Sequence, residues 1–196
     1  LDASSQLTVY DFLAEEFVKM EVKMTELCSQ METADDLTDI FEEYQNLLDR
    51  FDSVDGNNYE SNIKKKLGLA GLERHESTLV TKLSGGEFKL IQIIKEMLLF
   101  PTVLIMDEPD VFLDFSRLNA LKDLINSHKG TLLVITHSRY LLNHCFDKII
   151  HIENCEVQEF DGRYIDYNFY LLQKKIELME LAAKDTAEIE RNEQIV

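Results

Sequence analysis

Hydrophobic positions in the first third of the chain recur at alternating spacings of four and three residues. After Thr8, a residue that can cap a helix, the repeat is carried by Leu13, Phe17, Met20, Met24, Leu27 and Met31. Beyond the helix-breaking pair Asp35 and Asp36 it returns in Leu37, Phe41, Tyr44, Leu48 and Phe51. Two helices with matching apolar seams, joined by a short turn, are typical of an antiparallel helical hairpin. We predict that the seams pack on each other; a Met-rich partner-binding surface is the alternative.

Three further segments follow from turn residues and periodicity. The turn cluster that begins at Asp55 precedes a short helix over 59–69, which Gly68 or Gly71 would end. Strands over 148–152 and 155–160 are expected to form a hairpin across Glu153 and Asn154. From residue 166 onward the pattern predicts one long helix whose apolar face contains Leu172, Ile176, Met179 and Ala183.

Between these segments, Ser84, Gly85, Gly86 and Glu87 have the spacing of a capping box, which predicts the start of a helix. Glycines beside a helix N-terminus let a ligand approach the backbone N–H groups, and the positive end of the helix dipole favours an anion such as phosphate. The simpler interpretation is a well-capped helix without a ligand. The helix is too apolar for a surface position and is expected to end before Pro101.

The apolar run 103–106 predicts a buried, central parallel strand that presents Asp107 and Glu108 at its carboxyl end. Open α/β sheets bind ligands at that edge. Adjacent carboxylates repel each other unless a cation or a proton lies between them, and Mg²⁺ bound to nucleotide phosphates would supply the cation. Asp107 could then hold the metal, while Glu108 could orient or deprotonate a water molecule.

A second strand is expected at the same edge. A helix over 116–127 followed by Gly130 leads into a strand over 131–136, which completes a βαβ unit. His137 follows that strand and would therefore lie at the same edge as the two carboxylates. A histidine at a strand end is more often structural, so its role depends on the whole constellation.

The net charge of −17 over 196 residues argues against nucleic-acid binding by bulk electrostatics. Any contact with RNA has to be local, and the basic cluster Lys64, Lys65, Lys66 and Arg74 is either such a contact or a solvated helix face. No apolar run approaches the roughly 20 residues that span a bilayer, and no signal peptide is evident. We expect a cytoplasmic protein without membrane insertion.

The order of three motifs resembles that of an ATP-binding cassette (ABC) ATPase: LSGGE, then LIMDEP, then LVITH. The stretches DEPDVFLD, THSRYLL and GRYIDY are most similar to the ABC-F branch, whose members are soluble tandem ATPases that act on the ribosome. The resemblance implies ATP and Mg²⁺ as ligands. It also implies that Glu108 and His137 are catalytic, that Asp107 holds Mg²⁺ through water, and that Asp114 lies in the loop facing the other ATPase half. The signature residues 84–87 would contact the ATP held by that opposite half.

On this resemblance the chain is an α/β protein with a partial P-loop NTPase core, a helical signature subdomain, the inserted helical hairpin and a C-terminal helix. We expect four parts: a helical arm and the start of the helical subdomain (1–78), the signature helix (79–100), the Walker B half of the core (101–163) and a linker helix (164–196). No G-x-x-x-x-G-K-[ST] motif occurs in the sequence, so the phosphate-binding loop is missing. We therefore interpret the chain as a fragment of a first ATPase domain that is inactive alone.

The predicted function is the ATP-binding and ATP-hydrolysing domain of a ribosome-associated ABC-F protein, of the translation-factor or the antibiotic-resistance type. Its partners would be ATP, the second ATPase half and the ribosome, and the isolated chain could self-associate. The alternatives are an ATPase subunit of an ABC transporter or another ABC-type ATPase. A non-enzymatic interaction protein that kept the fold is a third class, which the intact Asp107, Glu108 and His137 disfavour.

Overall fold

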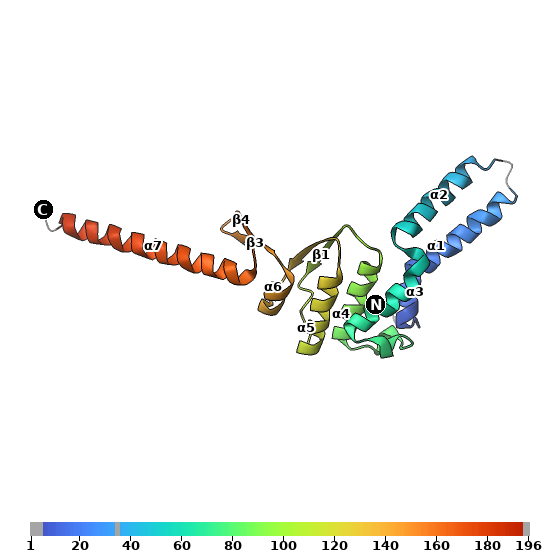
Figure 1. The fold of residues 1–196 in the computed structure, drawn as a ribbon, viewed down its shortest axis with the longest axis horizontal. Coiled ribbons are helices and arrows are strands. Elements are labelled where there is room, and N and C mark those ends of the chain that lie inside the picture. The colour runs from blue at the N-terminus through green and yellow to red at the C-terminus, as the bar shows by residue number, and fades with distance from the viewer. Residues whose placement is uncertain (1–5, 34–35, 194–196) are drawn as a thin grey trace. The chain divides into compact units, whose positions relative to one another are not determined.

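The chain folds into two compact units, Leu1–Thr136 and His137–Val196, in a computed structural model (Figure 1). Within them, residues 6–33 and 36–193 are described, with side chains as far as residue 184. The two units are defined by which residues pack together. The four parts expected from the sequence were defined by function, and they remain a prediction.

The first unit begins with the predicted helical hairpin, formed by α1 (Val9–Met31) and α2 (Thr38–Ser53), which run side by side in Figure 1. Thr8 caps α1 as expected, because its hydroxyl accepts a hydrogen bond from the backbone N–H of Asp11 at 3.1 Å. Of the two predicted turn residues, Asp35 lies outside the described residues. Asp36 accepts a hydrogen bond from the backbone N–H of Thr38 at 3.0 Å. The hairpin prediction is confirmed.

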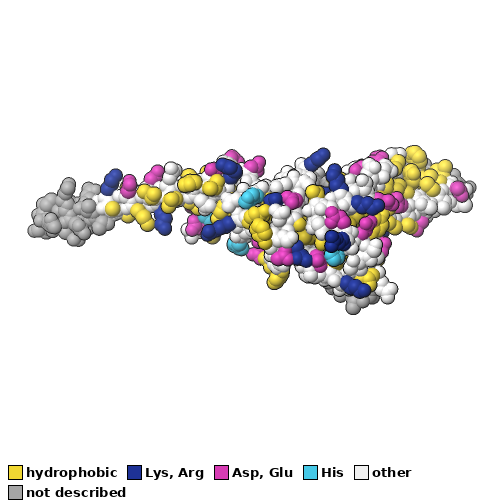
Figure 2. Space-filling model, turned by 60° about the horizontal axis from the view of Figure 1, so that its bottom comes forward, with side chains coloured by type: hydrophobic (Ala, Val, Ile, Leu, Met, Phe, Trp, Pro, Cys, Tyr) yellow, Lys and Arg dark blue, Asp and Glu magenta, His cyan; other side chains and the backbone are white. Residues whose placement is uncertain are grey.

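The two seams of the hairpin are unequally buried. In α1, Leu13, Phe17 and Leu27 are at most 1% exposed, whereas in α2 Phe41 is 59% exposed and only Phe51 is buried. The prediction that both seams are core is therefore correct for most of α1 and wrong for much of α2. The reason is that α1 packs against α2, α3 and α4, while α2 lies chiefly against α1. Figure 2 shows hydrophobic side chains at the surface of the hairpin.

The hairpin leads through the short turn η1 (Gly56–Asn58) into α3 (Tyr59–Ala70). Gly71 ends α3 in the left-handed conformation, with φ at 64°, which glycine adopts without the steric cost of a side chain. The turns η2 (Glu73–His75) and η3 (Val80–Lys82) then lead to α4 (Gly85–Leu98), the most deeply buried helix of the unit. The predicted helix 59–69 and the predicted buried signature helix are both confirmed.

A parallel βαβ unit follows α4. It consists of β1 (Val103–Asp107), α5 (Phe115–Ser127) and β2 (Thr131–Ile135). The strands are in register, so that Asp107 pairs with Ile135 at their carboxyl ends. The predicted βαβ unit is confirmed. In the described residues β1 and β2 form a two-stranded sheet of their own.

One face of this small sheet is open to solvent. Its side chains, which we call the open sheet face, are between 43% and 64% exposed and belong to Val103, Ile105, Leu133 and Ile135. The opposite face contains Met106, which is 7% exposed. The prediction that 103–106 forms a strand buried on both sides is thus wrong, because an apolar run specifies apolar faces but not what covers them.

The second unit contains α6 (Arg139–Cys145), a hairpin of β3 (Lys148–Glu153) and β4 (Glu156–Asp161), and the long α7 (Tyr164–Glu193). The turn of the hairpin is Asn154–Cys155, with φ angles of 51° and 63°, as a type I′ turn requires. It therefore lies one residue later than predicted. Asparagine at its first position favours this placement, since asparagine tolerates the left-handed region better than glutamate.

The predicted long helix is confirmed, and it begins two residues earlier than expected. Near its start Tyr167 is 5% exposed and packs against Phe160 and His151 of the hairpin. Farther along, Leu172 and Met179 of the predicted apolar face are 54% and 60% exposed. Among the described helices, none is both long enough and apolar enough to cross a membrane.

Candidate nucleotide-binding site

The predicted capping box forms at the start of α4. The carboxylate of Glu87 accepts hydrogen bonds from the backbone N–H of Ser84 at 2.8 Å and from its hydroxyl at 2.7 Å. In return, the backbone N–H of Glu87 donates to the hydroxyl of Ser84 at 3.4 Å. Ser84 and Gly85 are exposed, so a ligand can reach the N-terminus of the helix.

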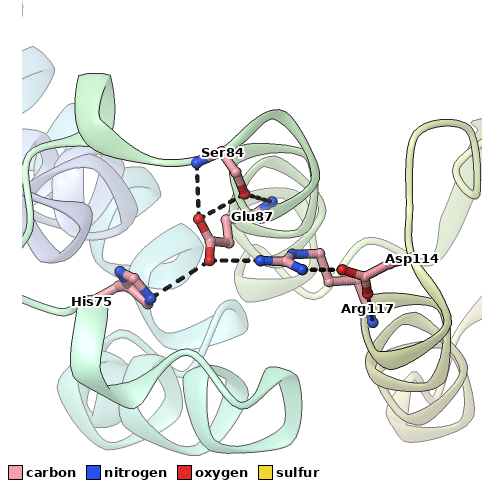
Figure 3. Close-up of polar contacts among 5 residues, drawn as sticks. All are labelled: His75, Ser84, Glu87, Asp114 and Arg117. Carbon is pink, nitrogen blue, oxygen red and sulfur yellow. Dashed lines mark hydrogen bonds and ion pairs between the residues drawn. The ribbon is translucent and has the colours of Figure 1, made fainter.

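Glu87 also connects the signature helix to α5. Its second carboxylate oxygen accepts from Nη2 of Arg117 at 2.8 Å and lies 3.7 Å from Nε2 of His75 (Figure 3). The other terminal nitrogen of Arg117, Nη1, donates to the carboxylate of Asp114. Asp114 is also the N-cap of α5, where it accepts from the backbone N–H of Arg117 at 2.8 Å. We call Ser84, Glu87, Arg117 and Asp114 the signature cluster.

The charges of the signature cluster stabilise one another. Hydrogen bonds from Ser84 and the nearby Arg117 guanidinium lower the pKa of Glu87 to about 2, although partial burial acts in the opposite direction. The pKa of Asp114 is lowered mainly by the backbone hydrogen bond from Arg117. The pKa of Arg117 is raised by its bond to Glu87. All three side chains are therefore ionised at neutral pH.

Gly86 allows the two helices to approach closely. A Cβ atom at this position would lie 2.8 Å from Cδ of Arg117 and 3.3 Å from Cδ2 of Leu113. Gly85 differs, since a Cβ atom there would meet nothing within 4 Å. The second glycine of the motif is thus favoured by the close approach of the Arg117 side chain of α5, whereas the first remains available for contact with a ligand.

Asp107 and Glu108 are placed at the carboxyl end of β1, as predicted, and both are exposed. The backbone N–H of Glu108 donates to the carbonyl oxygen of Ile135 at 2.8 Å, which holds the loop against the end of β2. Glu108 has φ at 43°, in the left-handed region that glutamate rarely adopts. Next to it, Thr136 donates from its hydroxyl to the carboxylate of Asp110 at 2.5 Å. This edge is therefore built by contacts between the ends of both strands.

The structure brings some of the predicted site residues together. Ser84 bonds Glu87 directly, Arg117 joins Glu87 to Asp114, and Asp107 and Glu108 lie together at the strand edge. His137 is exposed and follows β2 in sequence, as expected. Because it begins the second unit, its position relative to the two carboxylates remains a prediction.

The side chains at the strand edge suit a hydrated magnesium ion held by a nucleotide. Mg²⁺ commonly binds one or two carboxylates and completes its octahedron with water and substrate phosphates. Asp107 offers an exposed carboxylate for that purpose. In the described residues no group of three or more His, Cys, Asp or Glu side chains could hold a metal.

Arg117 and His75 are the members of this region that the sequence reasoning missed. A basic residue three positions after an aspartate N-cap is a recognisable pair, so the contact between Asp114 and Arg117 could have been predicted. The contact between Arg117 and Glu87 could not, because it joins residues 30 apart in sequence and depends on how α4 and α5 pack. No local pattern identifies His75.

Comparison with solved structures identifies the class of the fold. A structure described as the ATP binding subunit of an ABC transporter aligns with a TM-score of 0.50 at 21% identity. The alignment covers 82% of this chain and 62% of that one. Together with the βαβ unit and the capped signature helix, this likeness defines the fold as that of an ABC ATPase nucleotide-binding domain, a P-loop NTPase fold.

The sequence comparisons identify the family. Residues 28–143, more than half of the chain, match the family described as "AAA domain, putative AbiEii toxin, Type IV TA system". The chain belongs to this family, and it is similar to ABC ATPases, ABC-F proteins among them.

Three relatives illustrate this. The uncharacterized ABC transporter ATP-binding protein YfmR of Bacillus subtilis is 34% identical over 59% of this chain and 18% of its own length. The energy-dependent translational throttle protein EttA of Mycobacterium tuberculosis is 27% identical over 81% of this chain and 28% of its own. ABC transporter F family member 5 of Arabidopsis thaliana is 32% identical over 54% and 16%. The chain thus spans less than a third of each of these relatives.

Proposed function

We propose that this chain is part of an ATP-hydrolysing domain of an ABC-F protein that acts on the ribosome. The observation that carries the proposal is the placement of Asp107 and Glu108 together at the carboxyl end of β1, with the capped and exposed helix N-terminus at Ser84 in the same unit. ATP hydrolysis between two ATPase halves uses groups of both kinds: carboxylates that position a metal ion and a water molecule at one ATP, and an anion-binding helix end that contacts the ATP of the opposite half.

In the proposed mechanism, Glu108 orients the attacking water and accepts its proton, and Asp107 would hold Mg²⁺ through water. When bound, Mg²⁺ neutralises the charge that develops on the phosphates. His137 contacts the γ-phosphate, and residues 84–87 contact ATP held by the opposite ATPase half. Asp114 lies in the loop that faces this half. The phosphate-binding loop comes from outside these residues, because its motif does not occur in the sequence.

Two features support the proposed action on the ribosome. One is the helical hairpin α1–α2, which matches the place where the ABC-F branch carries an inserted helical arm. The other is the likeness to a relative named as a translational throttle protein. An ATPase subunit of an ABC transporter is the competing proposal, since two relatives are named as uncharacterized ABC transporter ATP-binding proteins. A transporter subunit rarely inserts a long helical hairpin at this place, so the hairpin favours the ABC-F branch.

The test uses a protein in which this chain is joined to a phosphate-binding loop and a second ATPase half. We expect Glu108→Gln to keep Mg-ATP binding and to abolish turnover, because an amide can hydrogen-bond to water but cannot accept its proton. Asp107→Asn should weaken Mg-dependent binding itself. Steady-state hydrolysis and nucleotide-binding assays distinguish the two, and hydrolysis by Glu108→Gln at the wild-type rate would remove Glu108 from this role.

The ribosomal part is tested separately by co-sedimentation. The Glu108→Gln protein should remain ATP-bound and pellet with ribosomes in the presence of Mg-ATP, and removal of the hairpin residues 9–53 should reduce this pelleting. If the wild-type protein hydrolyses ATP but the Glu108→Gln protein does not pellet with ribosomes in Mg-ATP, the result would favour another ABC-type ATPase.

A further inference from the structure

A hollow of about 530 Å³ lies at the amino-terminal ends of β1 and β2, opposite the edge that carries Asp107. Pro101 and Thr102 line it immediately before β1, and Gly130 lines it immediately before β2. Ligands of open α/β sheets usually bind at the carboxyl ends of the strands. A hollow at the other edge therefore requires its own explanation.

Three lysines line this hollow in a chain whose net charge is −17. Lys65 and Lys66 come from α3, and Lys129 from the loop between α5 and β2; with Ser127 and Phe100 we call them the lysine hollow. In the part of the chain that the structure describes, none of the three ammonium groups forms an ion pair. Lys66 donates a hydrogen bond to the hydroxyl of Ser127 at 2.8 Å, so its position is fixed.

The positive charge of the hollow is only partly neutralised. Its one acidic lining residue is Asp55, which accepts hydrogen bonds from the side-chain amides of Asn58 at 2.7 Å and Asn62 at 2.8 Å. Burial, together with the charge of Lys65, lowers the pKa of Lys66. That shift is what a partly buried cation shows when no anion accompanies it. A bound anion would relieve the repulsion between the lysines.

Phe100 supplies an apolar surface at the same hollow. Phe100 is 47% exposed as a residue. Its backbone has φ at 46°, an unfavourable conformation for a bulky residue and one that the following Pro101 disfavours further. Backbone strain of this kind persists where the surrounding structure imposes it, which is frequent at ligand sites. Exposed aromatic rings commonly stack on nucleobases, whose flat faces they match.

We propose that the lysine hollow binds a nucleotide, with its phosphate group held by Lys65, Lys66 and Lys129 and its base placed against Phe100. The nucleotide can be a free mononucleotide or one unit of an RNA strand, since both present a phosphate beside a flat base. The acidic remainder of the chain does not prevent this, because charges farther than about 8 Å away are largely screened at physiological ionic strength. The proposal goes beyond the ATPase function and does not depend on it.

The experiment is a titration of the isotope-labelled 196-residue chain, followed by amide NMR shifts. The ligands are inorganic phosphate, AMP, adenosine and a short single-stranded RNA. We expect phosphate and AMP to shift the amides around Gly130, AMP to bind more tightly, and adenosine to bind at least tenfold more weakly than AMP. Tighter binding of the RNA than of AMP would identify an RNA strand as the source of the phosphate. Equal or weaker binding would identify a free nucleotide.

Variants locate the binding. Lys129→Gln, in an exposed loop, should weaken the binding of AMP at least fivefold. The combination of Lys129→Gln with Lys66→Gln should abolish measurable AMP binding. Lys64→Gln is the matched control, because it removes the same charge from α3 at an exposed position outside the hollow. Phe100→Leu should weaken the binding of AMP and leave the binding of inorganic phosphate unchanged.

Two results would overturn the proposal. One is the absence of amide shifts with phosphate, AMP and RNA alike. The other is equal weakening by Lys64→Gln and Lys129→Gln, which would show general charge attraction rather than a site. Circular dichroism establishes whether each variant is folded. If Lys66→Gln does not fold, the comparison of Lys129→Gln with Lys64→Gln decides whether the site exists. Loss of ATP hydrolysis in a larger protein would test the ATPase proposal and leave this one untouched.

Discussion

Replacement of Glu87 by glutamine tests how the charge of the signature cluster contributes to stability. Glutamine keeps the shape of the side chain and can still accept hydrogen bonds from Ser84, but it cannot pair with Arg117 as an anion. Glu87 is a suitable probe because its side chain is only 15% exposed and its pKa is lowered from 4.5 to about 2. Ser84 is the main cause of that lowering, followed by Arg117.

The magnitude follows from the linkage between ionisation and folding. A pKa lowered to this extent corresponds to about 3–4 kcal/mol at most. Because Arg117 is 29% exposed, solvent weakens the ion pair, and the glutamine retains part of the hydrogen bonding. We therefore expect Glu87→Gln to lower the free energy of unfolding by about 1–2 kcal/mol at pH 7.

The effect should depend on pH in one direction only. A carboxylate whose pKa is lower in the folded state stabilises the fold above its unfolded pKa, and this stabilisation is lost as the pH falls toward the folded value. For Glu87 that window runs from about pH 4.5 down to about pH 2. The difference between the wild type and Glu87→Gln should therefore be full at pH 7 and should shrink steadily below pH 4.5.

The assay is urea unfolding of the 196-residue chain, followed by circular dichroism at pH 7, 5, 4 and 3. Glu96→Gln is the matched control, since Glu96 is an exposed carboxylate of the same helix, and it should change stability by less than about 0.5 kcal/mol. A loss in Glu87→Gln that is the same at pH 7 and pH 3 would refute the electrostatic reasoning. So would a loss no larger than that of Glu96→Gln.

Three further predictions concern the same unit. Gly86→Ala should destabilise the chain by about 1 kcal/mol in urea unfolding, because the new methyl group displaces Arg117. Gly85→Ala should be neutral or slightly stabilising. A larger loss of stability in Gly85→Ala than in Gly86→Ala would contradict the packing described here. In a two-half ATPase that contains this chain, Ser84→Arg should block the ATP-dependent closure of the halves without unfolding either, and closure seen by small-angle scattering in that variant would exclude a signature role. The 196-residue chain should self-associate through the open sheet face, so its mass by light scattering should rise with concentration, and a monomer at all concentrations would disprove that association.

The sequence predicted local structure better than burial. The cap at Thr8 and the capping box at Ser84 were predicted from their residues, because a cap depends on side chains within one helical turn. The βαβ unit was found because Gly130 and the apolar runs mark its boundaries. The exposure of Ile105 could not be predicted, since the sequence of an apolar strand is the same whether its second face is covered by other elements or open to solvent.

The candidate site shows the same limit. The residue types at 84–87, 107, 108 and 114 were identified from motifs, and the structure places each at the end of the expected element. The bridge through Arg117 was missed because it depends on the packing of two helices. The lysines at 64–66 were noted as a charged cluster, but the hollow also requires Lys129, which is far away in sequence.

The left-handed backbone of Glu108 has a consequence for protein engineering. Glycine would adopt φ of 43° without the cost of about 1–2 kcal/mol that a side chain incurs there. A selection for thermal stability alone should therefore enrich Glu108→Gly and discard the carboxylate at the strand edge. Under the proposed role of Glu108, directed evolution of an ATPase that contains this chain would have to select for activity and stability together, because at this residue the two demands would favour different amino acids.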